Sequence, residues 1–188
     1  MDFESRRPDV VRSVRQRWLL NYWERLRKSR PVPLWKDLAA EEIGGMADGM
    51  QFCDIATDGT AMRFVIRFRG ARITEAYGDC DGKFLDETLP PLLREATLST
   101  YRRAAESMRP VYTVCNTPDS TGRPVDFERL LLPFGDEGGR VHRILSMLEW
   151  VSIEGRFESR DLLKSQAAAP VYSLCSIIDH IETGAFTA

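Results

Sequence analysis

Asp79 and Asp81 flank Cys80 in a stretch of the chain that glycines interrupt, and paired carboxylates could act as a general acid and base. A solvated polar turn explains the same residues, because Asp side chains favour turns, and we favour that interpretation. The sequence contains no GxSxG nucleophile elbow, no GxxxxGK(S/T) phosphate loop and no HExxH zinc motif. We therefore expect no catalytic activity.

The histidines and cysteines are too dispersed for a metal site. His142 and His180 lie on separate predicted elements, and the four cysteines include no CxxC pair, whereas a dedicated zinc site needs its ligands clustered. His142 could ligate haem iron from a strand, although a structural histidine fits the same position. No photoactive flavin–thiol motif surrounds Cys80. The sequence therefore predicts no particular cofactor, and haem and flavin stay open.

The stretch from Met62 to Leu89 carries the pattern that would position a binding site. Met62, Phe64, Ile66 and Phe68 alternate with residues that include three arginines, which predicts a strand with one buried face. Glycines then break the chain into short helical pieces. Such pieces would form a concave cover over a sheet, a shape that suits a small molecule.

The remaining elements are predicted from the spacing of apolar residues. In helices, apolar residues recur every three to four positions; in strands, they alternate with polar residues or form an unbroken run. We expect helices over residues 8–28, 37–43, 71–77, 91–108, 159–167 and 171–181. We expect strands over residues 50–55, 62–69, 111–116, 126–134 and 141–152. The last three strands follow one another with short turns, so they should form an antiparallel meander.

The first helix is strongly basic, although the whole chain has a formal net charge of -2. Nine basic residues and two acids lie between Arg6 and Arg30. A solvated face explains them, and a surface for an acidic protein, nucleic acid or membrane headgroups is the alternative. Nucleic acid is disfavoured, because no docking motif accompanies the charge. The apolar side of this helix predicts a partner or dimer surface made of Val11, Val14, Trp18, Tyr22 and Leu26.

The sequence lacks the segments that direct a chain into or across a membrane. No apolar run approaches the roughly 18 to 20 residues of a membrane span, and the N-terminus lacks the apolar stretch of a signal peptide. We therefore expect a cytoplasmic protein.

Ten segments together match one known family. In chain order they are Tyr22-Trp23, Pro33, Asp37, Asp54, the run from Phe64 to Ile73, Gly78-Asp79, Gly82, Arg109-Pro110, Leu130 to Pro133 and Arg143 to Leu145. Their order and spacing between Trp18 and Trp150 resemble the PAS domain, and more specifically a bacterial family of small stand-alone PAS proteins.

The resemblance implies an α+β fold, with a five-stranded antiparallel sheet covered by short helices. It leaves an N-terminal amphipathic helix over residues 1–30, a PAS-like domain over residues 31–155 and a C-terminal helical extension over residues 156–188. It also implies a sensory or interaction module without catalysis, which would bind a small ligand or a signalling partner. The two apolar helices expected at opposite ends of the chain favour a homodimer.

A small-molecule pocket should be mostly apolar with a few polar groups. Our candidates lie on the predicted strands and their helical cover, and Arg72 or Arg109 could meet a carboxylate. The full set is Phe64, Ile66, Phe68, Arg72, Tyr77, Phe84, Leu85, Arg109, Leu130, Leu132 and His142. A completely filled core explains the apolar members slightly better. The alternative function is therefore a ligand-free structural adaptor whose basic first helix docks on an acidic partner.

Overall fold

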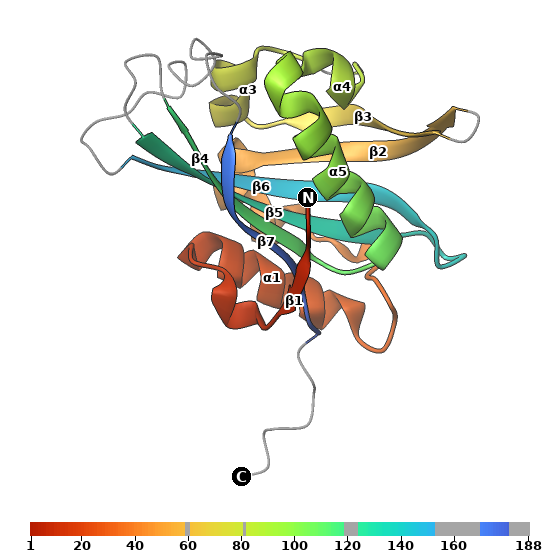
Figure 1. Cartoon of the computed structure of the whole chain (residues 1–188). Coiled ribbons are helices and arrows are strands. Elements are labelled where there is room, and N and C mark those ends of the chain that lie inside the picture. The colour runs from red at the N-terminus through yellow and green to blue at the C-terminus, as the bar shows by residue number, and fades with distance from the viewer. Residues whose placement is uncertain (59–60, 81, 119–123, 153–169, 181–188) are drawn as a thin grey trace.

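A computed structural model of the chain describes residues 1–58, 61–80, 82–118, 124–152 and 170–180. Within these residues, seven strands form one sheet with the order β1-β7-β4-β5-β6-β2-β3 (Figure 1). The strands are β1 (Glu4–Arg6), β2 (Met50–Asp58), β3 (Ala61–Arg69), β4 (Val111–Pro118), β5 (Pro124–Gly135), β6 (Val141–Ser152) and β7 (Val171–Ile178). The α-helices are α1 (Val14–Arg27), α2 (Ala40–Ile43), α3 (Ala71–Tyr77), α4 (Leu85–Thr88) and α5 (Pro91–Ser107).

Five antiparallel strands, β3, β2, β6, β5 and β4, form the part of the sheet that the sequence predicts. Helices α3, α4 and α5 cover one face, which we call the α5 face, and α1 packs on the opposite face, the α1 face (Figure 1). Each face has its own apolar core. The predicted α+β class and the β4–β5–β6 meander are therefore confirmed.

Helix α1 begins at Val14, six residues later than the pattern predicts. Ser13 caps it, because its hydroxyl oxygen accepts from the backbone N–H of Gln16 at 3.4 Å. Pro8 instead starts a single 3-10 turn, η1 (Pro8–Val10). Trp23 is fully buried on the α1 face and donates its indole N–H to the carbonyl of Pro133 at 2.8 Å. This contact fixes the helix against β5.

The segment before β2 is less helical than expected. Instead of one helix over residues 37–43, two 3-10 turns, η2 (Trp35–Asp37) and η3 (Gly44–Gly49), flank the short α2. Gly70 ends β3 against η3, where any Cβ would overlap the backbone carbonyl oxygen of Ala47. Only glycine fits there, so the change from strand to helix at Gly70 follows from close backbone packing.

Strand β3 departs from strict alternation at one point. Its partner pairs are Cys53 with Ile66 and Phe52 with Phe68, so Arg67 is an extra residue without an opposite number. Such a β-bulge moves every later side chain to the other face of the sheet. Phe68 therefore lies with Phe52 on the α1 side, with ring centroids 5.0 Å apart, and the prediction that it shares a face with Ile66 is wrong.

The C-terminal segment is a strand, which corrects the helix expected over residues 171–181. β7 lies between β4 and β1, antiparallel to the first and parallel to the second. The edge of β4 presents unpaired backbone groups, which a strand can satisfy and a helix cannot. Two isoleucines, Ile177 and Ile178, also favour a strand. The helix expected over residues 159–167 lies outside the described residues.

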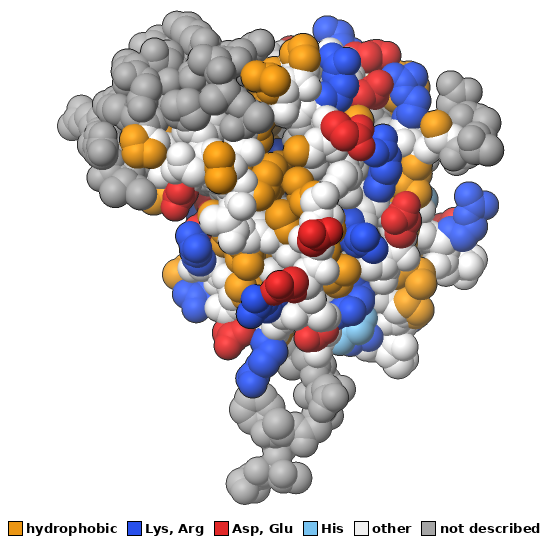
Figure 2. Space-filling model, viewed as in Figure 1, with side chains coloured by type: hydrophobic (Ala, Val, Ile, Leu, Met, Phe, Trp, Pro, Cys, Tyr) orange, Lys and Arg blue, Asp and Glu red, His pale blue; other side chains and the backbone are white. Residues whose placement is uncertain are grey.

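The surface shows no preference for one sign of charge on the side that Figure 2 presents. Acidic and basic side chains are interspersed over α5 and its surroundings, with small apolar areas between them (Figure 2). In the described part of the chain, no helix is long and apolar enough to span a membrane.

Candidate functional site

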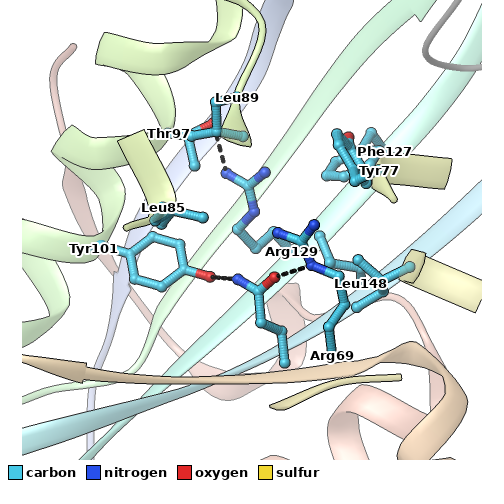
Figure 3. Close-up of a pocket in the computed structure, with 11 residues that line it drawn as sticks. Arg69, Tyr77, Leu85, Leu89, Thr97, Tyr101, Phe127, Arg129 and Leu148 are labelled. Atoms are coloured by element: carbon cyan, nitrogen blue, oxygen red, sulfur yellow. Dashed lines mark hydrogen bonds between the residues drawn. The ribbon is translucent and has the colours of Figure 1, made fainter. Parts of the chain in front are cut away.

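A small cavity lies between the α5 face of the sheet and the helical cover (Figure 3). Its volume is about 20 Å³, which is roughly the room that one water molecule needs. Both apolar and polar side chains line it: Gln51, Arg69, Ile73, Tyr77, Leu85, Leu89, Thr97, Tyr101, Phe127, Arg129 and Leu148. Any organic ligand must therefore move part of this wall as it binds.

Arg129 is the most unusual residue of the cavity, because its side chain is charged and the residue is only 8% exposed. β5 directs it to the α5 face together with Phe127, whose ring centroid lies 5.2 Å from the guanidinium carbon. One guanidinium nitrogen donates to the hydroxyl of Thr97 at 3.4 Å (Figure 3). No carboxylate of the described residues forms an ion pair with Arg129.

Among the described residues, the groups around Arg129 that could become negative are phenols and a thiol. Burial raises the pKa of Tyr77 to about 12 and that of Cys115 to about 11. Burial also raises the pKa of Tyr101 and of Tyr172, and the nearby guanidinium of Arg129 opposes the rise at Tyr172. All four groups are neutral at pH 7, so they provide no counter-charge.

A chain of hydrogen bonds crosses the floor of the cavity. Arg69 donates from Nε to Oε1 of Gln51 at 2.7 Å, and Gln51 donates from Nε2 to the hydroxyl of Tyr101 at 3.1 Å (Figure 3). Tyr101 in turn donates to the hydroxyl of Ser146 at 3.0 Å. Because each of these groups has a partner, the orientation of the Gln51 amide is fixed.

Arg69 also holds the rim of the cavity together. It donates to the carbonyl of Gly78 at 3.2 Å, to the sulfur of Cys80 at 2.9 Å and to the hydroxyl of Thr88 at 3.4 Å. Cys80 is therefore a buried acceptor next to the cavity. Asp81, the second carboxylate of the acid–base interpretation, lies outside the described residues.

Two of the eleven predicted pocket residues, Tyr77 and Leu85, line the cavity. Phe64 and Ile66 lie fully buried in the core on the same face without reaching the cavity. Leu130 and Leu132 belong to the core on the α1 face. Both faces of the central strands are buried, so β5 contains an uninterrupted apolar run. The sequence therefore does not indicate which face Leu130 and Leu132 occupy.

The other predicted residues have contacts of their own. The guanidinium carbon of Arg63 lies 3.5 Å from the ring centroid of Phe84. Arg72 donates to the carbonyl of Leu148 at 2.7 Å and pairs with Glu149 at 3.0 Å.

Arg109 pairs with Asp179 near β7. His142 is half-buried, and its Nδ1 has no hydrogen-bond partner among the described residues. No group of three or more His, Cys, Asp or Glu side chains in the described ranges could hold a metal ion.

Gln51, Arg69, Thr97 and Arg129 were not among the candidates, although one signal points to Arg129. Arg129 follows Phe127 by two residues, so alternation along β5 places both on one face. Arg69 reaches the cavity only because of the bulge at Arg67, and the sequence pattern does not predict this bulge. Gln51 is its direct cross-strand partner.

The predicted partner surface divides in two. Val11 and Tyr22 are buried against the domain, and Leu26 is partly buried. Val14 is 73% exposed and Trp18 is 37% exposed on α1. Trp18 stacks on Tyr22, with ring centroids 5.3 Å apart. Only Val14 and Trp18 are therefore free to contact another molecule.

Comparison with known proteins gives one match to a family model. The model is described as a PAS domain and matches residues 11–149. The search of curated proteins returned no match.

Three solved structures illustrate the structural similarity. VqmA bound to DPO is 16% identical with a TM-score of 0.45, covering 60% of this chain and 58% of that one. The Vibrio cholerae VqmA dimer without target DNA is 17% identical with a TM-score of 0.46, covering 64% and 55%. An RNA-binding light-oxygen-voltage receptor is 17% identical with a TM-score of 0.39, covering 69% and 36%. The chain thus spans little more than half of the VqmA chains it matches.

Proposed function

The chain belongs to the PAS domain family, and we propose that it is a non-catalytic sensory module which binds a small ligand in the cavity under α3–α5. It would pass the occupied state on through protein contacts. The observation that carries this proposal is the set of polar groups that converge on the cavity. Gln51, Thr97, Tyr101 and Arg129 are all less than a tenth exposed, although apolar side chains would fill the same space at a lower cost.

β5 offers a route from the cavity to both ends of the chain. Arg129 faces the cavity and interacts with Tyr172 of β7. Its neighbour Glu128 accepts, at its backbone carbonyl, a hydrogen bond of 3.3 Å from Nε2 of Gln16 on α1. A ligand that bound Arg129 more tightly in one arrangement of these contacts would shift the population toward that arrangement. We expect α1 and β7 to respond together.

The output surface in this proposal is the exposed part of α1 around Val14 and Trp18. A second copy of the chain is the expected occupant, which makes the module a homodimer. Light scattering should find a dimer at micromolar concentration, and Trp18→Glu should produce a monomer that remains folded. A wild-type monomer, or an unchanged dimer in Trp18→Glu, would rule out this surface.

The same surface supports the adaptor as a second candidate. Arg17 and Arg25 are exposed on the same helix as Trp18, so an acidic partner could dock on α1 without any ligand in the cavity. The two functions differ in what the purified protein carries. Location in the cytoplasm and the division of the chain at residues 30 and 155 remain predictions under either one.

The test of the sensory function is the absorbance spectrum and native mass of freshly purified protein. We expect a mass above that of the chain, which disappears on denaturation. Colour would identify haem or flavin as the added group. A colourless protein with the bare chain mass, whose melting temperature does not change in cell extract, would favour the adaptor.

A further inference from the structure

The arginines of this domain differ in whether a carboxylate accompanies them. Arg63, Arg72 and Arg143 are all partly exposed, and each pairs with an acid at 3.0 Å or less. Arg129 is more deeply buried than these three, and no described carboxylate pairs with it. Burying an unpaired charge is strongly unfavourable, so a deeply buried guanidinium to which the described residues supply no counter-charge requires another explanation.

A second cation enters the same cavity. Figure 3 shows the side chain of Arg69 reaching in from β3 and that of Arg129 from β5. None of the described hydrogen-bond partners of Arg69 is a carboxylate: they are Gln51, Gly78, Cys80 and Thr88. Like charges repel strongly where water is scarce. The cavity therefore holds two guanidinium groups and no carboxylate of the described residues.

From this arrangement we infer that the ligand carries a negatively charged head group, specifically a carboxylate, which Arg129 recognises with the help of Arg69. The inference rests on the proposed sensory function. A guanidinium presents its N–H donors as a planar fork that matches the two oxygens of a carboxylate. The hydroxyl of Thr97, 3.4 Å from the Arg129 guanidinium, is a further donor beside that fork.

The rest of the wall indicates what the ligand carries behind its head group. Ile73, Leu85, Leu89, Phe127 and Leu148 make the remaining surface apolar or aromatic. The present space holds only a water-sized group, so a hydrocarbon body must displace the side chains from α4. That helix has only four residues, which makes it the smallest part of the cover. A short-chain or aromatic monocarboxylic acid fits this chemistry.

Matched acids and amides separate charge from shape. The full chain is titrated with acetate, isobutyrate and benzoate, and with acetamide, isobutyramide and benzamide, at constant ionic strength. Melting temperature and calorimetry report binding to wild type, to Arg129→Met and to Arg102→Met, a control on α5 outside the cavity. We expect at least one acid to bind, its amide to bind at least about tenfold more weakly, and Arg129→Met to lose the acid by a similar factor. Arg102→Met should behave as wild type.

The ligand-free variants provide a readout that a purely structural arginine would not give. Without ligand, Arg129→Met should melt at the wild-type temperature or up to about 2–4 °C above it, because it removes a buried charge that no described carboxylate neutralises. If Arg129→Met fails to fold, Arg69→Gln becomes the test. Weaker acid binding in Arg69→Gln would support the paired-arginine site, and unchanged acid binding would contradict it.

The outcomes also separate this inference from the proposed function. Amides that bind as tightly as their acids, or a neutral molecule released from the purified protein, would overturn the carboxylate and leave the sensory function intact. If no acid or amide binds and the native mass is that of the chain alone, both the carboxylate and the sensory function are contradicted.

Discussion

Arg69 donates to Gln51 across 2.7 Å inside the cavity, although strict alternation along β3 would place these two side chains on opposite faces of the sheet. The extra residue Arg67 causes the exchange, because it turns Phe68 outward and Arg69 inward. Because of this bulge, the cation of Arg69 lies at the floor of the cavity, and the ring of Phe68 does not.

The bulge predicts unequal costs for two neighbouring truncations in β3. Ile66→Ala should destabilise the protein by about 2–5 kcal/mol, because Ile66 is fully buried. Phe68→Ala should cost about 1 kcal/mol, since Phe68 is 36% exposed and mainly loses its contact with Phe52. Urea unfolding measures both. Equal losses would mean that Phe68 lies in the core and that β3 has no bulge.

The hydrogen-bond chain at the cavity floor predicts a specific cost for Tyr101→Phe. Removing the hydroxyl leaves Nε2 of Gln51 and the hydroxyl of Ser146 each without one partner in a buried place. The expected loss is about 1–3 kcal/mol of the free energy of unfolding. Tyr77→Phe is the matched control, because the Tyr77 hydroxyl makes no hydrogen bond with a described residue. A smaller loss of stability in Tyr101→Phe than in the control would contradict this series of hydrogen bonds.

Asp54 predicts part of the acid sensitivity of the fold. Burial alone would raise the pKa of Asp54, but hydrogen bonds from Arg143 at 2.5 Å and Arg67 at 2.8 Å outweigh burial and lower the pKa below its usual value. The folded carboxyl then takes up a proton less readily than the unfolded one. The contribution of Asp54 to the free energy of unfolding is complete above the unfolded pKa of about 3.9. It disappears as the pH falls through the lower pKa of the folded state.

The measurement is melting temperature against pH. Between about pH 5 and pH 2 the wild type should lose more stability than Asp54→Asn, which cannot be protonated. Parallel curves for the two proteins would show that the arginine contacts do not favour the charged form of Asp54.

Because β7 pairs with β4, we expect that removing the C-terminal segment destabilises the sheet. A chain that ends at residue 169 lacks Ile178, which is fully buried, and exposes the edge of β4. We expect a lower melting temperature and concentration-dependent self-association, because an open edge strand invites pairing. A chain that ends at residue 180 is the control. Equal stability of the two truncated chains would contradict the pairing of β7 with β4.

The sequence was sufficient for the central sheet because apolar periodicity and glycine positions report directly on strands and turns. It failed where a long-range contact decides the outcome. Residues 171–178 have apolar spacing compatible with a helix, and pairing with the free edge of β4 decides for the strand. The bulge at Arg67 likewise depends on pairing with β2, which is invisible in β3 alone.

The sequence predicts two residues of the helical cover of the candidate site, but it does not predict the polar residues that line the cavity. Tyr77 and Leu85 follow from the glycine-punctuated stretch, and both line the cavity. Arg129 was overlooked because apolar residues dominate β5 and an arginine in a strand usually faces solvent. Strict counting from Phe127 would have placed it inward. Buried polar residues in an otherwise apolar strand are therefore the signal to search for in related chains.

Native mass spectrometry of wild type and Arg129→Met, purified side by side from the same cells, tests the central claim most directly. The account predicts that wild type carries an added mass which is released on denaturation as a carboxylic acid. It predicts that Arg129→Met, equally folded, has the bare chain mass. The same added mass on both proteins would contradict it, and so would a bare chain mass for a wild type that also binds none of the matched acids or amides.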